Sequence, residues 1–271
     1  MSGAQSVAVG DAALRSPAGL RVDRDGAVVT ITIDRPDSRN SQTPALWREL
    51  VDVANSFGPE TRAVILQGSG SAFSAGLDRA MFAQGIPGEP SLLTLADQSA
   101  EDFSDTIATY QRAFTCWREL DAITVAAVQG YAIGAGFQLA LGADMMVVAE
   151  DVQLSMKETQ LGLVPDLGGT KPLIQAVGYS RALEICASGR WLGAEEAVAS
   201  GIAVASSPVP ELAERAEALV ASMLSAPPNA LIETKKLLRD ADLRTRAQQC
   251  EQERDAQRRR ITELATLVKG Q

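Results

Sequence analysis

The chain has 271 residues, a net charge of −9 and a pI of about 4.7, and 46% of its residues are hydrophobic. This composition is typical of a globular protein with one large domain, or one domain with a helical appendage. The acidic balance offers no basic surface for nucleic acid, and no apolar run reaches the roughly 18 residues that span a bilayer. We therefore expect a protein that binds neither nucleic acid nor a membrane.

The cysteine and histidine contents narrow the chemistry. Cys116, Cys186 and Cys250 are widely spaced and form neither a disulfide framework nor a metal motif, which indicates a cytoplasmic protein. The absence of histidine excludes Ser-His-Asp and Cys-His catalysis and most catalytic zinc sites, and we expect no metal. Acid–base chemistry must then come from Asp, Glu, Tyr, Lys or Cys.

The first elements after the N-terminus are a hairpin and a helix. The segment LRVDRDGAVVTITID predicts two strands joined by a turn at Asp25-Gly26, because its apolar residues alternate with polar ones. Thr43 is a predicted N-cap with Pro44 at the first helical position, and the helix should continue to about residue 56.

The middle of the chain alternates between apolar strands and loops of small residues. RAVILQG (62–68) predicts a short buried strand, and residues 84–99 contain the Gly and Pro of a mobile loop. We expect a helix over 102–120 and a single apolar strand in TVAAVQGYAIG (124–134).

The last third of the chain is mostly helical. DMMVVAE and IAVAS predict two more strands, and helices are expected at 170–177, 179–188, 194–200, 209–226, 229–240 and 244–268. Strands separated by helices indicate an α/β fold with buried, largely parallel strands. We divide the chain into a disordered lead-in (1–18), a core (19–205) and a C-terminal helical region (206–271).

Two loops share one design. FSAGLD (73–78) and GYAIGAGF (130–137) each follow an apolar strand and lead toward a helix through small residues. Small residues let backbone N–H groups approach a ligand, and two converging N–H groups would form an oxyanion hole. The alternative is a pair of tight turns that serve packing alone.

Five motifs, taken together, resemble the enoyl-CoA hydratase/isomerase (crotonase) superfamily over about residues 20–240. In chain order they are ITIDRPDSRNS, AVILQGSGSAFSAGLD, AAVQGYAIGAGFQLALGAD, MKETQLGLVPDLGGT and RALEICASGRWLGAEEAVASGI. The resemblance implies a crotonase-like spiral of β-β-α units, a C-terminal helical trimerisation region, and a homotrimer or dimer of trimers. It also implies an acyl-CoA thioester as substrate, with CoA as part of that substrate and no separate cofactor.

The resemblance assigns the two oxyanion donors to the backbone N–H groups of Leu77 and Ala135. It places CoA against the loops on either side, through Arg39, Ser74, Ala75, Gly76, Asp78, Arg79 and Gly134. Lys235 is expected to reach the CoA of a neighbouring subunit, and Asp144 to be structural. For the arginines and the lysine, the alternative is that they are solvated surface residues.

Three residues are candidates for the chemistry: Glu158, Asp166 and Gln138. Hydratases of the family carry a glutamate at the position of Gln138 and another at Glu158. An amide cannot act as a base, so Gln138 either orients water or substrate or has a structural partner. Glu158, beside apolar residues, should have a raised pKa and transfer protons, and Asp166 is either a second acid or a turn residue.

These residues leave two hypotheses open. The first is an enzyme that stabilises a thioester enolate and moves protons through Glu158, with double-bond isomerisation preferred over hydration because Gln138 replaces an acid. The second is a non-catalytic acyl-CoA-binding protein on the same fold.

Overall fold

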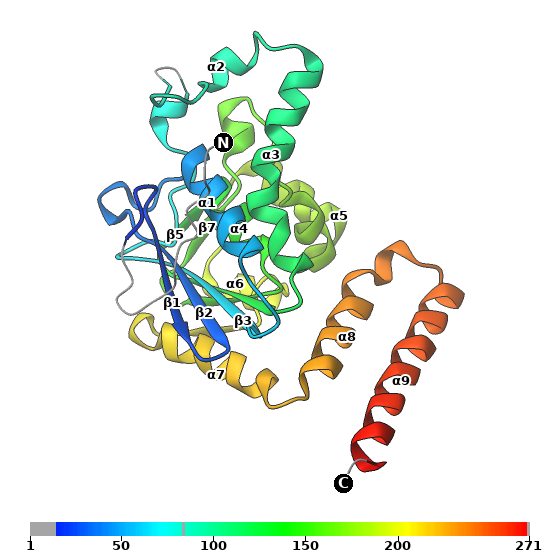
Figure 1. The fold of residues 1–271 in the computed structure, drawn as a ribbon. Helices are drawn as coiled ribbons and strands as arrows, with labels where there is room; N and C mark the ends of the chain where they lie inside the picture. The colour runs from blue at the N-terminus through cyan, green and yellow to red at the C-terminus, as the bar shows by residue number, and fades with distance from the viewer. Residues whose placement is uncertain (1–14, 83–84, 270–271) are drawn as a thin grey trace, which may run out of the picture.

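A six-stranded sheet lies at the centre of the computed structural model, which describes residues 15–82 and 85–269 (Figure 1). Its strands, in spatial order, are β1 (Leu20–Asp25), β2 (Val28–Ile33), β3 (Ala63–Gly68), β4 (Ile123–Val128), β6 (Met145–Ala149) and β8 (Ala205–Ser207). The pair β1–β2 is antiparallel and the other pairs in this sheet are parallel. The prediction of a largely parallel sheet is therefore confirmed.

A second, two-stranded sheet divides the segment 124–134. β5 (Tyr131–Ile133) leaves the main sheet after β4 and pairs in parallel with β7 (Gln153–Ser155). The chain turns at Gly130, where φ is +54° and a Cβ would lie 2.0 Å from the carbonyl oxygen of Ser71. The prediction of a single strand here is wrong, because its apolar residues belong to two sheets separated by a glycine turn.

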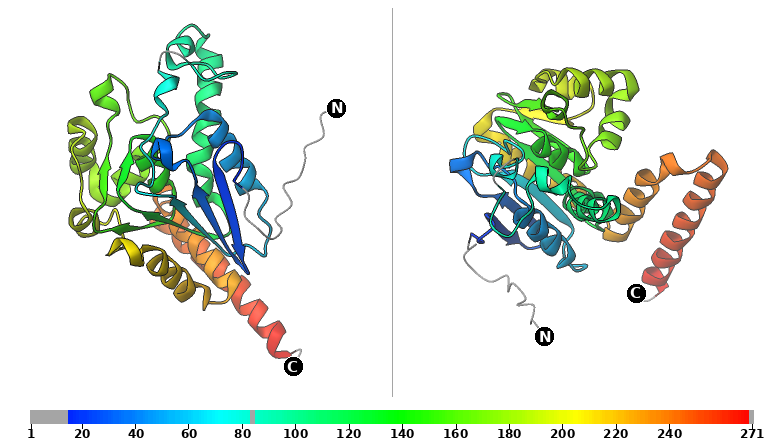
Figure 2. Two further views of the ribbon diagram at one scale, coloured as in Figure 1. Left: turned by 90° about the vertical axis from the view of Figure 1, so that its left-hand side faces the viewer. Right: turned by 90° about the horizontal axis from the view of Figure 1, so that it is seen from above.

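Helices cover both faces of the main sheet (Figures 1 and 2). Val64 and Leu66 of β3 join a core with α1 (Pro44–Asn55), α3 (Ala100–Glu119) and α4 (Ala135–Gly142). Ala63 and Ile65 of the same strand point the other way, into a core with α7 (Leu212–Leu224). Adjacent residues of a strand thus pack into cores on opposite faces of the sheet. This is why the sequences of these strands are continuously apolar.

The predicted helix boundaries are largely confirmed. The hydroxyl of Thr43 accepts a hydrogen bond from the N–H of Leu46, with Pro44 at the first helical position of α1. α5 (Thr170–Ser188) is interrupted at Gly178, whose φ of +75° and ψ of +167° separate the two helices expected there. The remaining helices are α2 (Leu92–Leu95), α6 (Ala194–Ala199), α8 (Pro228–Arg239) and α9 (Arg246–Lys269).

The C-terminal region has two parts. α7 packs against the main sheet, whereas α8 and α9 form a hairpin in which α9 is the helix that lies away from the sheet (Figures 1 and 2). In the described part of the chain, no helix is both long and apolar enough to cross a bilayer.

Two segments that we expected to be disordered or mobile contain hydrogen bonds or a helix. Residues 1–14 of the predicted lead-in lie outside the described residues, but Ser16 donates a hydrogen bond to Glu49 (2.7 Å) and accepts one from the N–H of Leu20 (2.9 Å). The expected loop at 84–99 contains α2, and an ion pair between Arg48 and Glu89 ties it to α1.

Candidate active site

The two glycine-containing loops lie side by side. The N–H of Ser74 donates to the carbonyl of Tyr131 (2.9 Å), and the N–H of Ile133 donates to the carbonyl of Ser74 (3.0 Å). At Gly76, where φ is +86°, a Cβ would lie 2.4 Å from the Ile133 oxygen and 3.7 Å from the nitrogen of Ala135. The loop before Leu77 therefore runs against the chain that leads into Ala135.

The N–H groups of Leu77 and Ala135 are both free in the described part of the chain. The carbonyl of Gly76 accepts from the N–H of Gln42, and the N–H of Asp78 donates to the carbonyl of Gln42. Among the described residues, no acceptor faces the N–H of Leu77 between them. Ala135 is the first residue of α4, and its N–H likewise meets no acceptor among the described residues. A helix N-terminus adds partial positive charge, so this arrangement can hold an oxygen that gains negative charge.

Buried polar side chains hold the first loop in place. Asn40 donates to the carbonyl of Ala72 (2.7 Å). The hydroxyl of Ser74 donates to the carbonyl of Asn40 (2.7 Å) and accepts from Gln42 (3.1 Å) and from the N–H of Gly76 (3.2 Å). Ser74 is fully buried, so its side chain supports the loop and does not face a ligand. Sequence reasoning missed Asn40 and Gln42, although Asn40 lies within one of the motifs.

The other residues expected to bind CoA differ in exposure and in the number of hydrogen bonds that they make within the protein. Asp78 caps a short turn and is bonded to Arg35 (3.2 Å) and Ser41 (2.9 Å). Burial would raise its pKa, but hydrogen bonds from Ala80, Ser41 and Arg35 lower the pKa overall. Arg79 is exposed on the following turn.

Arg39 and the small residues lie next to the loops themselves. Arg39 is exposed at a φ of +51°, its carbonyl accepts from Ala75 (2.8 Å), and its guanidinium lies 5.9 Å from the Tyr131 ring. Gly134 donates to Ser155 (2.8 Å) and directly precedes the N-terminus of α4. Among the described residues, the structure therefore leaves the exposed guanidinium groups of Arg39 and Arg79 and the N–H groups of Leu77 and Ala135 as groups that can meet a ligand.

Gln138 and Glu158 form the most direct contact in the site. The Nε2 of Gln138 donates to the Oε1 of Glu158 (2.7 Å), and its Oε1 accepts from the N–H groups of Leu167 (3.0 Å) and Gly169 (3.2 Å). Gln138 is 1% exposed. Its carbonyl oxygen is therefore fully engaged by the protein, and the amide serves to hold the Glu158 carboxylate.

The second oxygen of Glu158 is unpartnered. Oε2 is buried and makes no hydrogen bond within the described residues. The carboxylate lies beside the chain that leads into Ala135, because a Cβ at Gly134 would be 3.2 Å from Oε1. Burial raises the pKa of Glu158, hydrogen bonds from its own backbone and Gln138 oppose this, and the charge of Asp166 adds to the rise. The expected shielding by Leu161 and Leu163 is partial, since they are 59% and 40% exposed.

Asp166 belongs to the same group of residues. It lies on the loop whose Leu167 and Gly169 bind Gln138. Burial raises the pKa of its carboxyl. The structure thus brings the three candidate residues for chemistry together.

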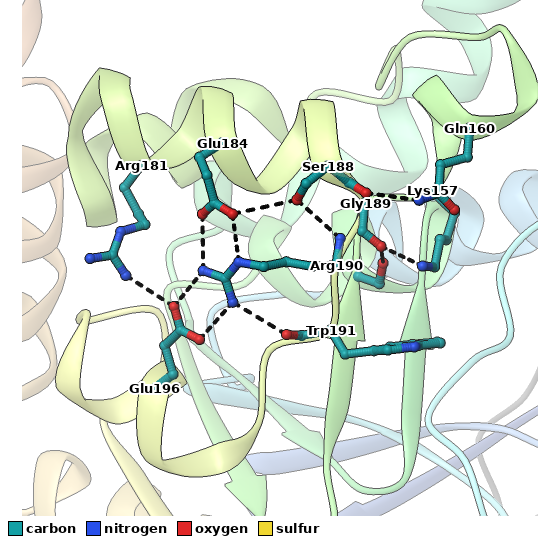
Figure 3. A network of polar contacts seen from close by, with 10 residues as sticks. Lys157, Gln160, Arg181, Glu184, Ser188, Gly189, Arg190, Trp191 and Glu196 are labelled. Atoms are coloured by element: carbon teal, nitrogen blue, oxygen red, sulfur yellow. Dashed lines mark hydrogen bonds and ion pairs between the residues drawn. The ribbon is translucent and has the colours of Figure 1, made fainter.

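The segment that carries Glu158 is anchored on the C-terminal end of α5 (Figure 3). The carbonyl of Gly189 accepts from the hydroxyl of Ser155 (2.8 Å) and from Lys157, and Gln160 donates to the carbonyl of Ser188 (2.8 Å). Arg190 then bridges the carboxylates of Glu184 and Glu196, which joins α5 to α6. Polar contacts therefore fix the backbone on both sides of Glu158.

Lys235 does not face a ligand. Its Nζ is buried and donates to Asp144 (2.7 Å) and to the carbonyl of Ala122 (2.6 Å). Asp144 also accepts from the N–H of Thr124 (2.7 Å). The expectation that Lys235 reaches CoA is wrong for this chain, because its ammonium group is used to dock α8 on the core. The structural role expected for Asp144 is confirmed.

Comparisons with known proteins agree with the motifs. The model of the enoyl-CoA hydratase/isomerase family matches residues 23–266. "Probable enoyl-CoA hydratase EchA17" of Mycobacterium tuberculosis (strain ATCC 25618 / H37Rv) is 34% identical over 250 residues, 91% of this chain and 88% of the relative. Carnitinyl-CoA dehydratase of Escherichia coli is 32% identical over 223 residues, 81% of this chain and 80% of the relative.

Solved structures match as well. The crystal structure of a candidate enoyl-CoA hydratase from Thermobifida fusca YX, in complex with acetoacetyl-CoA, superimposes with a TM-score of 0.86 at 42% identity. The match covers 91% of this chain and 96% of the other. The chain belongs to the enoyl-CoA hydratase/isomerase family and has its α/β fold.

Proposed function

We propose that the protein is an acyl-CoA enzyme that moves a proton through Glu158 while the N–H groups of Leu77 and Ala135 hold the thioester oxygen. The observation that carries this proposal is the buried Oε2 of Glu158, which has no hydrogen-bond partner among the described residues and lies next to a loop whose Ala135 N–H has none there either. An unsatisfied buried carboxylate oxygen is costly and calls for an explanation, and a substrate proton supplies one.

The reaction that fits best is the shift of a double bond in an enoyl-CoA. Glu158 removes a proton from C2 of a 3-enoyl-CoA, and the electron pair moves through the thioester to give a dienolate. The two N–H groups stabilise the charged oxygen, and a group of this kind is typically worth about 10²–10³ in rate. Glu158 then delivers the proton to C4, which gives a 2-enoyl-CoA and restores the carboxylate.

Hydration is the weaker reaction for this site. Water addition benefits from a second acid–base group, and Gln138 cannot ionise. Its oxygen already accepts two N–H groups and its nitrogen donates to Glu158, so it offers water no acceptor. A positioned acid or base is worth about 10²–10⁴ in rate, and we expect hydration to be lower by such a factor.

The relatives support a CoA thioester as the substrate. The Thermobifida fusca protein has been solved with acetoacetyl-CoA and with CoA, and the Escherichia coli relative is named a carnitinyl-CoA dehydratase. The loop backbone at Ala75 and Gly76, with Arg39 and Arg79, is the surface proposed for CoA, since guanidinium groups suit phosphate. The homotrimer or dimer of trimers, the cytoplasmic location and the absence of a separate cofactor remain predictions.

The test is proton exchange in D₂O. We expect deuterium to enter C2 and C4 of 3-enoyl-CoA with wild-type protein, as followed by mass spectrometry. Glu158→Gln should abolish exchange while tight binding of the CoA ester remains. Exchange that survives in Glu158→Gln would refute the assignment of Glu158.

The second candidate function is acyl-CoA binding without catalysis. Gln138 favours it, because an amide stands where hydratases of the family carry an acid. Tight binding of 2-enoyl-CoA and 3-enoyl-CoA without exchange in wild-type protein would establish this function and refute the enzyme. Strong hydratase activity in Gln138→Glu would show that the native chain was not tuned for water addition.

A further inference from the structure

Residues 166–169, here called the acid loop, are held between two helices. On the α4 side, the N–H groups of Leu167 and Gly169 donate to Gln138. On the α3 side, the Nε2 of Gln111 donates to the carbonyl of Asp166 (2.6 Å). Two glutamines on different helices therefore define the path of the loop that carries the second carboxylate.

Close packing on both sides limits the loop to this path. At Gly168, where φ is +88°, a Cβ would lie 2.9 Å from the methyl group of Thr115, one turn after Gln111 on α3. At Gly169 a Cβ would lie 2.7 Å from the Cγ of Gln138. The loop is thus in contact with α3 and α4 at adjacent residues, and a change in either support moves its backbone.

The two supports differ in what they hold. Gln138 is bonded to Glu158 directly, whereas Gln111 has no hydrogen bond to either carboxylate in the described part of the chain and donates to a backbone oxygen. A side chain that fixes the backbone of a charged residue thereby determines the position of that residue's charge. Gln111 contributes such a contact to Asp166.

We propose that Gln111 is a positioning residue, which holds Asp166 close to Glu158 by binding the Asp166 carbonyl. This inference rests on the proposed proton transfer by Glu158. Glu158 and Asp166 are the titrating carboxyls that meet at this loop, and Gln111 and Gln138 are neutral. The thiol of Cys186 is also near, since the charge of Glu158 contributes to the rise in its pKa. Holding the second negative charge in place keeps Glu158 a stronger base than a lone carboxylate would be.

The predicted effect has a definite sign. The charge of Asp166 raises the pKa of Glu158, and burial raises the pKa of Asp166. Loss of the Gln111 bond lets the acid loop move toward solvent, which weakens both effects. The pH below which exchange fails should therefore fall in Gln111→Met, as it should in Asp166→Asn.

The experiment is a double-mutant cycle on the pH profile of C2 exchange in 3-enoyl-CoA. We expect Gln111→Met to lower the plateau rate about tenfold, less than the 10²–10⁴ lost with a positioned acid or base because Glu158 itself remains, and to shift the acid limb to lower pH. In the Asp166→Asn background, Gln111→Met should change neither quantity. Gln175→Met is the matched control, because it removes an exposed amide on α5 that donates to Asp242 and accepts from Arg118.

The outcomes separate this inference from the proposed function. An equal effect of Gln111→Met in both backgrounds, or an unchanged profile, would overturn the role of Gln111. Absence of exchange in wild-type protein would overturn the proposed function instead. Titration of the Asp166 carboxyl by ¹³C NMR remains informative in that case, because Gln111→Met must lower its pKa for the inference to stand.

Discussion

Gln138→Glu is the most informative substitution, because it places a second carboxylate against Glu158. The amide nitrogen lies 2.7 Å from the Oε1 of Glu158, and the introduced oxygen would take its place. Two unit charges 4 Å apart repel by about 4 kcal/mol at an effective dielectric constant of about 20, and this pair is closer. The N–H groups of Leu167 and Gly169 already bind the amide oxygen. Because hydrogen bonds to a charged acceptor are stronger, they offset part of this repulsion by about 1 kcal/mol each.

The remaining penalty of about 2 kcal/mol should appear as pH-dependent stability. The folded protein should hold one proton between the two carboxyls, with a pKa raised above the roughly 4.3 of a glutamate in an unfolded chain. A carboxyl whose folded pKa is raised is compatible with folding at low pH and loses stability as the pH rises through that pKa. The variant should therefore be close to wild type at pH ~5 and less stable at pH ~8.

Thermal unfolding followed by circular dichroism checks this. A loss of about 2 kcal/mol corresponds to a fall in Tm of about 4–8 °C relative to wild type at the higher pH. The control is the double variant Gln138→Glu/Glu158→Gln, which exchanges the carboxyl and the amide and should restore the pH dependence of the wild type. A Tm difference that is equal at both pH values would show that repulsion between these two carboxylates does not cause the loss of stability.

Two further predictions test the loop and the C-terminal hairpin. Gly76→Ala should abolish exchange and lower Tm, because its Cβ would clash with a backbone oxygen at 2.4 Å, whereas Gly88→Ala has a similar positive φ and open space and should lose much less. Lys235→Met should destabilise the fold by about 3–5 kcal/mol in chemical denaturation, because it leaves Asp144 without its buried partner. Lys236→Met, next to it but more exposed, should cost no more than about 1 kcal/mol, and an equal cost would contradict the role given to the buried pair.

The sequence predicted the fold where local signals were strong. The Thr43-Pro44 start of α1 and the break at Gly178 depend on N-cap chemistry and on glycine in a backbone conformation that few other residues adopt. The division of 124–134 between two sheets was not predictable. The turn at Gly130 is required by the close approach of the Ser71 carbonyl, which is distant in sequence. The three-residue strand β7 was missed for a related reason, since it is defined mainly by its pairing with β5.

The proximity of the three candidate residues was predictable from the motifs, whereas their hydrogen bonds were not. The motifs placed Gln138, Glu158 and Asp166 together, and the structure agrees. That Gln138 binds the acid loop as well as Glu158 depends on the approach of residues about 30 positions away, which no local pattern encodes. The roles of Gln111 and Lys235 were not predictable for the same reason. Both residue types are common in helices, and their partners, a carbonyl and a carboxylate, are distant in sequence.

Every residue of α4 is buried, including Ala135 at its first position and Gln138 in its interior. A helix enclosed in this way has little freedom to reorient when a charge appears at its N-terminus. The dipoles that would meet an enolate are aligned when the chain folds, so little of that alignment has to be repeated in each turnover. The rate of such a site then depends on the integrity of the core around α4, and packing mutations far from any substrate should act as catalytic mutations.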